Sequence, residues 1–324
     1  MKTAPATMIG VPSASRGLLL TAARSFYRNH SDLIKESHGI VHAERVHHHA
    51  CRAIESLSEA GSAALQRQRG RPPPPLSSDE ALEIEAAALL HDVDDDKYFP
   101  KESPGGRDTD IESKDEAERQ KHYAALYPNA VELMNEAGIP ESSYERILFM
   151  IDAVSCSKNG NSVPARIDGG NNSNSDSNNK NNDNDNDNET NYHWLIPRWS
   201  DRIEAVGARG VWRCYQYNQE KKRPLCLPGI TPRPESLDEL WSHVVPERFE
   251  AYMEAADGET GDDSMIGHYY DKLLHVACPP RDIVRNGYLE EKLGDSAKEL
   301  VEVCLRYGRT GVVDEEYIRG FRDA

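Results

Sequence analysis

Hydrophobic residues recur along this chain at helical spacing. Between residues 41 and 57 they follow one another every three to five positions, and segments 82–90 and 147–154 each carry a buried-type apolar face. No segment shows convincing alternation of apolar and polar residues, which is the signature of a half-buried strand. The pattern therefore predicts an all-α protein.

Capping residues and glycines place the ends of several predicted helices. Ser77, Ser78 and Asp79 are good N-caps for a helix that should end near Asp92. We expect further helices over 17–30, 129–137, 195–213, 264–276 and 297–307. A polar helix should end at about residue 127, and one or two helices should lie within 235–256.

Polar and proline-rich stretches interrupt the helical pattern. Four consecutive prolines lie within 71–76, and residues 169–191 are almost entirely Asn, Asp and Ser. We expect a single domain over 16–310 with insertions at about 66–78, 160–192 and 221–263. The Asn/Asp tract should be disordered, and the third insertion should add a helical segment. Residues 1–15 are expected to form a flexible N-terminus and 311–324 a C-terminal tail.

The charge balance limits the classes of partner. The 324 residues include 38 Lys and Arg against 55 Asp and Glu, a formal net charge of −17. Binding to a nucleic-acid polymer needs clustered cations, so this composition excludes a general nucleic-acid binder. A small phosphorylated substrate remains compatible, because a metal ion and a few cations can offset its charge.

The sequence gives limited information about location. No apolar run approaches the roughly 18–20 residues that span a bilayer, so no membrane partner is expected. The six scattered cysteines are typical of reduced thiols and favour the cytoplasm. The first 30 residues carry basic side chains and no acid, which keeps a mitochondrial presequence as an alternative. The oligomeric state stays open.

Histidine and aspartate side chains suited to a metal ion occur in three short stretches. These are His42, the adjacent pair His91 and Asp92, and Asp201. Neighbouring residues inside a helix point about 100° apart, but at a helix end both can converge on one ion. Mixed imidazole and carboxylate ligands suit Mn, Fe, Co, Ni or Zn better than calcium, and carboxylates also admit Mg.

The residues around these candidates resemble the HD-domain metal-dependent phosphohydrolase superfamily. Residues 38–46 (HGIVHAERV) are similar to the H-xxx-H-xx-RV opening of one subgroup, and residues 86–97 (AAALLHDVDDDK) to its A-x-LLHD-xx-D-x-K motif. Residues 200–213 (SDRIEAVGARGVWR) and 267–274 (GHYYDKLL) resemble two later motifs. The resemblance covers roughly residues 18–306. The subgroup includes bacterial nucleotide pyrophosphohydrolases and uncharacterised fungal relatives.

The resemblance implies an HD-domain helical bundle with one divalent ion. His42, His91, Asp92 and Asp201 would be its ligands, with Mn as the first candidate and Co, Ni, Mg, Fe or Zn as alternatives. Asp95 and Lys97 complete the second motif. Asp95 would orient the attacking water or act as its base, and Lys97 would contact phosphate.

We expect further substrate contacts, each of which has an alternative interpretation. Arg45 would contact phosphate or hold Asp92 or Asp201 through a salt bridge. Ser155 and Lys158 would contact substrate or belong to a helix cap. Arg213, expected on the same helix as Asp201, would reach phosphate if that helix lines the pocket.

Other polar residues near the motifs receive structural interpretations. Glu204 would orient a partner side chain, and Lys272 would form a structural ion pair or contact substrate. The run of histidines at 47–49 is interpreted as a solvated helix face. A binuclear site needs further histidines, for which only His122 and His193 are available, so one ion is favoured.

The predicted function is hydrolysis at phosphorus of a small phosphorylated substrate, most readily a nucleotide, by water that the metal activates. Resemblance suggests pyrophosphate release from a nucleoside triphosphate, and phosphomonoester hydrolysis is the nearest competitor. Two alternatives from other classes stay open: a regulatory or scaffolding protein on an HD fold, and a binuclear HD oxygenase.

Overall fold

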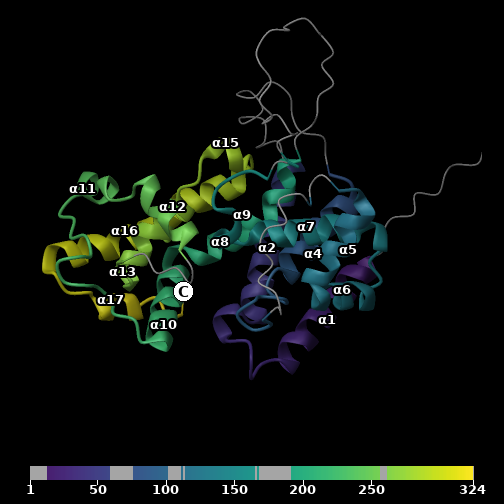
Figure 1. The fold of residues 1–324 in the computed structure, drawn as a ribbon, viewed down its shortest axis with the longest axis horizontal. Coiled ribbons are helices and arrows are strands. Elements are labelled where there is room, and N and C mark those ends of the chain that lie inside the picture. The colour runs from purple at the N-terminus through teal and green to yellow at the C-terminus, as the bar shows by residue number, and fades with distance from the viewer. Residues whose placement is uncertain are drawn as a thin grey trace, which may run out of the picture.

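The computed structural model describes residues 13–58, 76–100, 111, 114–164, 166–167, 191–255 and 261–323. Every regular element in these ranges is helical, which confirms the predicted all-α class (Figure 1). The proline tract and the Asn/Asp tract lie outside the described residues, so their predicted behaviour stays a prediction. Residues 13–15, expected to be flexible, instead begin the first helix, and the Ser15 side chain is buried.

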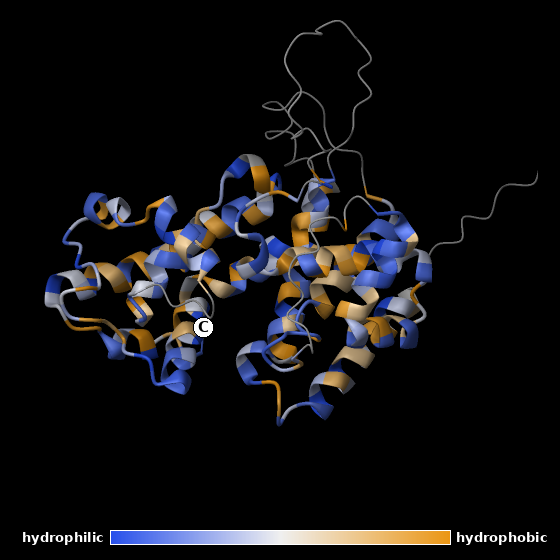
Figure 2. Ribbon diagram, viewed as in Figure 1, coloured by the Kyte–Doolittle hydropathy of each residue, from blue (hydrophilic) through white to orange (hydrophobic). Residues whose placement is uncertain are grey.

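The helices form two lobes, each with its own hydrophobic core (Figure 1). The first lobe is built from α1 (Ser13–Asn29), η1 (Glu36–His38), α2 (Ile40–Ser58), α4 (Ser78–Leu90), α5 (Glu116–Leu126), α6 (Pro128–Glu136), η3 (Glu141–Ser143), α7 (Tyr144–Val154), η4 (Tyr192–Leu195), α9 (Ile196–Ala205) and α15 (Arg281–Val284). In Figure 2 the central helices α4 and α7 are mostly orange, whereas α5 at the rim is mostly blue.

The second lobe holds the later helices. They are α10 (Gly207–Lys221), α11 (Leu237–Ser242), α12 (Pro246–Glu254), α13 (Met265–His268), the π-helix η6 (Tyr269–Leu273), α14 (Leu274–Ala277) and α17 (Glu315–Arg319). The short helix α8 (Cys156–Asn159) contacts α7 of the first lobe and α12 of the second. The predicted added segment therefore exists as α11 and α12, and Leu240 of α11 is fully buried.

The longest helix, α16 (Gly287–Thr310), belongs to both lobes. Leu289 and Leu293 near its start pack into the first core, whereas Leu300, Val303 and Tyr307 pack into the second. The segment predicted as a C-terminal tail continues this packing, because Ile318 of α17 is fully buried in the second core.

The helix predicted over 195–213 is in fact two helices. α9 ends at Ala205, and α10 begins at Gly207, which adopts a positive φ of 70°. At Gly210 the chain passes so close that an added Cβ would lie 2.3 Å from the carbonyl oxygen of Ala205. Both glycines are therefore required by the turn. As a result, Asp201 and Arg213 lie on different helices, which corrects the expectation that they share one.

After an exposed first turn, most of helix α4 is buried at the centre of the first lobe. Ser77 starts it with a capping box in which Ser77 and Glu80 bond each other's backbone N–H groups. The alanines at 86, 87 and 88 are fully buried. Small side chains let neighbouring helices approach closely, and α4 packs against α2, α7 and α9. Within the described ranges, no helix is both long and apolar enough to cross a membrane.

Candidate metal centre

All four predicted metal ligands come together where α2, α4 and α9 meet. His42 lies in the first turn of α2, and Asp201 lies on α9. His91 is the C-cap residue of α4, and Asp92 follows it where the backbone leaves the helix. The helix end therefore allows adjacent side chains to converge, as the sequence predicted. The three helices pack against one another, which fixes the relative positions of these side chains.

The donor atoms are spaced as ligands of one ion would be. His42 Nε2 lies 3.2 Å from His91 Nε2 and 3.2 Å from Asp201 Oδ1. Asp92 Oδ2 lies 3.5 Å from His42 Nε2 and 3.3 Å from His91 Nε2. Ligands about 2.1 Å from an ion are about 3.0 Å apart in an octahedron and about 3.4 Å apart in a tetrahedron. His42, His91 and Asp201 could therefore hold a metal ion, and Asp92 is placed to join them.

The tautomer of His91 also suits a metal ligand. Its Nδ1 lies 2.9 Å from the carbonyl oxygen of Ala88 in the preceding turn. A carbonyl oxygen only accepts, so Nδ1 carries the proton and Nε2 presents its lone pair to the cluster when the ring is neutral. Such a backbone hydrogen bond is the usual support of a metal-binding histidine.

His42 is in contact with Arg213 from the second lobe. Arg213 Nη1 lies 3.3 Å from His42 Nδ1 and donates to the carbonyl oxygen of Glu204 at 3.1 Å. A guanidinium only donates, so this contact requires the His42 proton on Nε2. An ion at Nε2 would move that proton to Nδ1, leaving Arg213 bonded only to the carbonyl. The predicted substrate contact Arg213 is thus adjacent to a ligand.

The electrostatics of the cluster favour a cation. Burial alone would raise the pKa values of Asp92 and Asp201, but the neighbouring imidazoles hold both well below their ordinary value. Although burial opposes it, the two carboxylates raise the pKa of His91 well above its ordinary value. Burial and Arg213 lower the pKa of His42. Two ionised carboxylates therefore face one protonated and one neutral imidazole, and a divalent ion could replace the proton.

Buried arginines position the helix that carries Asp201. Arg198 donates to the carbonyl oxygens of Ala153 and Ser162, both at 2.7 Å. Arg202 donates to the carbonyl oxygen of Gly160 and packs over the Trp199 ring. Both arginine side chains are almost completely buried. These bonds anchor α9, which carries Asp201, to the end of α7 and to the segment that follows it.

The loop after His91 and Asp92 is fixed by Asp94, a residue that the sequence reasoning did not single out. Its two carboxylate oxygens accept from the backbone N–H groups of Asn129 and Ala130, at 3.0 and 2.9 Å. Asp94 thereby satisfies donors in the first turn of α6. No local sequence signal marked this role, because Asp94 lies 35 residues before Asn129 and α5 lies between them.

Asp95 and Lys97 lie together on this loop. Asp95 Oδ1 accepts from the Lys97 backbone N–H at 2.9 Å, and Lys97 Nζ lies 3.3 Å from Asp95 Oδ2. Lys97 Nζ also donates to His38 Nε2 at 3.4 Å. Burial lowers the pKa of His38 to about 3, which keeps it a neutral acceptor. The ring centroids of His38 and His42 are 6.2 Å apart, so Lys97 and Asp95 lie beside the candidate metal ligands.

The remaining predicted substrate contacts differ in their surroundings. Lys158 lies 3.7 Å from Asp152 and 3.9 Å from Asp96, so carboxylates of the first lobe already face it. Ser155 Oγ lies 3.2 Å from the neighbouring Ser157 Oγ, its one hydrogen-bond partner among the described residues. Among the described residues Arg45 forms no hydrogen bond or ion pair, so the alternative of a salt bridge to Asp92 or Asp201 is wrong.

The histidine run at 47–49 is only partly a solvated face. His48 is exposed, but His49 Nδ1 lies 2.7 Å from the Tyr288 hydroxyl and His49 Nε2 lies 3.3 Å from Glu204. Glu204 therefore orients a partner side chain, as expected. His47 belongs to a second cluster with Cys51 and Glu85, which sequence reasoning missed. The four-residue spacing of His47 and Cys51 on one helix was the available signal.

Two further expectations concern residues outside the cluster. Within the part of the chain that the structure describes, Lys272 forms no ion pair, so the predicted structural pair is wrong. Its ammonium instead lies 5.2 Å from the centroid of the Tyr252 ring. His122 and His193 belong to no described group of three or more metal-ligand side chains.

Comparisons with known proteins find similar proteins but indicate no activity. No protein-family model matches the chain. An uncharacterized protein of Acanthamoeba polyphaga mimivirus is 28% identical over 297 residues, which cover 90% of this chain and 96% of the viral protein. A Lactobacillus plantarum protein, solved as a structural genomics target, shares 17% identity with a TM-score of 0.48, covering 92% of this chain and 97% of its own. The chain is thus similar over nearly its whole length to a viral protein of unassigned activity.

Proposed function

We propose that this chain is a metal-dependent phosphohydrolase of the HD-domain type, acting on a small phosphorylated substrate with a nucleotide as first candidate. The observation that carries the proposal is the convergence of His42, His91, Asp92 and Asp201 from three separate helices. The donor spacing and the tautomer of His91 both suit one divalent ion. Mn²⁺ is the first candidate on the ligand set, with Co, Ni, Mg, Fe or Zn as alternatives.

The proposed reaction uses water to displace an oxygen at phosphorus. A bound divalent ion would lower the pKa of water and offset phosphate charge. Asp95, with 16% of its side chain exposed beside the ligands, orients the water or accepts its proton. Lys97 is 56% exposed and tethered only to Asp95 and His38, so its ammonium can turn to a phosphate oxygen.

Two arginines near His42 complete the proposed phosphate environment. Arg213 reaches His42 from the second lobe, and a change of the His42 tautomer would release one of its donors. Arg45 lies one turn from His42 and has no anionic partner among the described residues. A triphosphate carries several charges, so three cations around one site favour it over a monoester.

The test measures metal dependence and product together. Purified protein is stripped with chelator, reloaded with Mn²⁺, Co²⁺, Ni²⁺ or Mg²⁺, and assayed on nucleoside triphosphates and phosphomonoesters. Pyrophosphate and orthophosphate are measured separately, because they distinguish the two proposed reactions. Wild type is compared with Asp92→Ala and with Glu132→Gln, an exposed position on α6.

We expect turnover that depends on metal, is lost in Asp92→Ala and is unchanged in Glu132→Gln. The proposal fails if no metal restores turnover on any of these phosphoesters, or if Asp92→Ala hydrolyses them as fast as wild type. Two ions retained by the cluster of His42, His91, Asp92 and Asp201 would instead support the binuclear alternative.

A further inference from the structure

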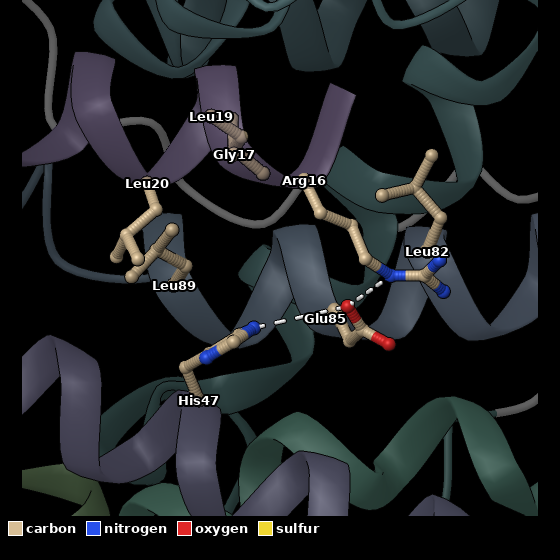
Figure 3. Close-up of a pocket in the computed structure, with 8 residues that line it drawn as sticks. All are labelled: Arg16, Gly17, Leu19, Leu20, His47, Leu82, Glu85 and Leu89. Carbon is tan, nitrogen blue, oxygen red and sulfur yellow. Dashed lines mark hydrogen bonds and ion pairs between the residues drawn. The ribbon is translucent and has the colours of Figure 1, made fainter. Parts of the chain in front are cut away.

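A second group of metal-ligating side chains lies between α2 and α4, away from the proposed centre. His47 and Cys51 are one turn apart on α2, and Glu85 faces them from α4. Their ligand atoms all lie within 4.8 Å of one another. Figure 3 shows Glu85 between His47 and Arg16, beside the leucines of α1 and α4.

The geometry points to a site for a thiophilic divalent ion such as Zn²⁺, held by Cys51, His47 and Glu85. These are the three ligand classes that zinc prefers in proteins: a thiolate, an imidazole and a carboxylate. The group differs in chemistry from the proposed centre, whose ligands are only imidazoles and carboxylates. The two sites therefore should differ in the metals they select.

The distances support such an ion. Tetrahedral zinc, with a Zn–S bond of about 2.3 Å and a Zn–N bond of about 2.1 Å, separates the sulfur and nitrogen by about 3.6 Å. Cys51 Sγ lies 3.6 Å from His47 Nε2. The corresponding nitrogen–oxygen separation is about 3.4 Å, against 3.9 Å between His47 Nε2 and Glu85 Oε2. Glu85 would need to approach His47 Nε2 by about half an ångström, and its ligand oxygen lies within 4.8 Å of Cys51 Sγ.

Arg16 hydrogen-bonds the Glu85 oxygen that faces His47, and this oxygen keeps a second lone pair for an ion. Arg16 Nε donates to Glu85 Oε2 at 2.7 Å, and its side chain is 39% exposed, against 13% for Glu85. Ligating carboxylates in proteins are themselves hydrogen-bonded, which orients them toward the ion. The positive charge of Arg16 offsets the negative charge of Glu85. The Cys51 thiolate would therefore supply the net negative charge that attracts the ion.

The fourth coordination position has room for a small ligand. His47, Glu85 and Arg16 line a cavity of about 190 Å³, whose other walls include Leu19 and Leu89. Three protein ligands beside an open position is the arrangement of accessible zinc sites, whereas structural sites use four. We expect water there, in a pocket that is apolar apart from these three residues.

The test uses Co²⁺ as the probe, because only this site contains sulfur. Cobalt bound to a thiolate gives a near-ultraviolet sulfur-to-metal charge-transfer band, which imidazole and carboxylate ligands do not produce. We expect full-length wild type to bind two equivalents of Co²⁺ and to show the band. Cys51→Ser and His47→Gln should each weaken binding at this site roughly 10–100-fold, and Cys51→Ser should abolish the band.

Control variants separate this site from the other cysteines and from the proposed centre. Cys278→Ser removes an exposed thiol and should leave the band unchanged. Asp201→Asn should reduce binding at the other centre and also leave the band unchanged. Circular dichroism checks that each variant is folded. A wild-type protein without the band, or a band that persists in folded Cys51→Ser, would overturn the inference whatever the hydrolase assay shows.

Discussion

Replacing Asp201 with asparagine should remove most of the stabilisation that a divalent ion gives to the folded protein. The substitution keeps the shape of the side chain and a carbonyl oxygen, but it removes one of the two formal negative charges of the cluster. In the structure that carboxylate lies 3.2 Å from His42 Nε2 and 3.6 Å from His91 Nε2. Affinity should therefore fall at least 100-fold, the upper end of what loss of a supporting residue costs.

The expected size follows from linkage between binding and folding. Metal at 100 times the wild-type Kd stabilises the folded state by about 2.7 kcal/mol. After a 100-fold loss of affinity the same concentration equals Kd, and the stabilisation is about 0.4 kcal/mol. The difference of about 2.3 kcal/mol corresponds to about 3–4 °C in Tm for a chain of 324 residues, at an unfolding entropy of about 2.1 cal/mol/K per residue.

Thermal unfolding with and without Mn²⁺ measures this difference. Each protein is first stripped with chelator, so that the baseline effect of the substitution is recorded separately. Glu132→Gln removes an exposed carboxylate of α6 and should keep the full metal-dependent shift. Equal shifts in wild type and Asp201→Asn would refute the assignment of Asp201 as a ligand. So would a wild-type Tm that none of Mn²⁺, Co²⁺, Ni²⁺ or Zn²⁺ changes.

Three further predictions concern stability. Gly210→Ala places a Cβ 2.3 Å from a backbone oxygen and should cost at least about 3 kcal/mol in urea unfolding, whereas Gly294→Ala, with open space around it, should be neutral or stabilise by up to about 1 kcal/mol. Glu145→Gln leaves two arginines of the first lobe without their buried carboxylate and should cost about 3 kcal/mol by the same measurement. Although burial opposes it, Cys51 and Glu85 raise the pKa of His47 to about 9. This contribution to stability is complete below about pH 6.5 and is lost as pH rises through about 9. In chelator, the unfolding free energy of wild type should fall between about pH 7 and pH 10 by up to about 3 kcal/mol more than that of His47→Gln. An unchanged slope in His47→Gln would contradict the role of His47.

Local signals in the sequence were sufficient for much of the first lobe. The apolar spacing over 41–57 corresponds to α2, and the cap at Ser77 corresponds to the start of α4. The convergence of His91 and Asp92 followed from one further fact, that a helix end lets adjacent side chains converge. These features depend on residues close in sequence, which is why a pattern could predict them. The meeting of His42 with this pair, 49 residues away, was implied only by the resemblance to the HD-domain superfamily.

Features that depend on long-range packing were not predictable in this way. The break between α9 and α10 is a local exception: amphipathic spacing over 195–213 does not distinguish it from a continuous helix, and the available signal was the pair Gly207 and Gly210. The sequence predicted a solvated His49, but in the structure Tyr288 of α16 contacts it. Glu85 likewise became a partner of Cys51 only through the packing of α2 on α4.

The position of α16 in both cores has a consequence for how the chain folds during synthesis. All four proposed ligands precede residue 202, yet Leu289 and Leu293 of α16 belong to the core that surrounds them. A ribosome must therefore deliver nearly the whole chain before the first lobe can complete its core. Domains usually fold in order from the N-terminus, but this arrangement makes assembly of the centre an event that follows translation of the second lobe.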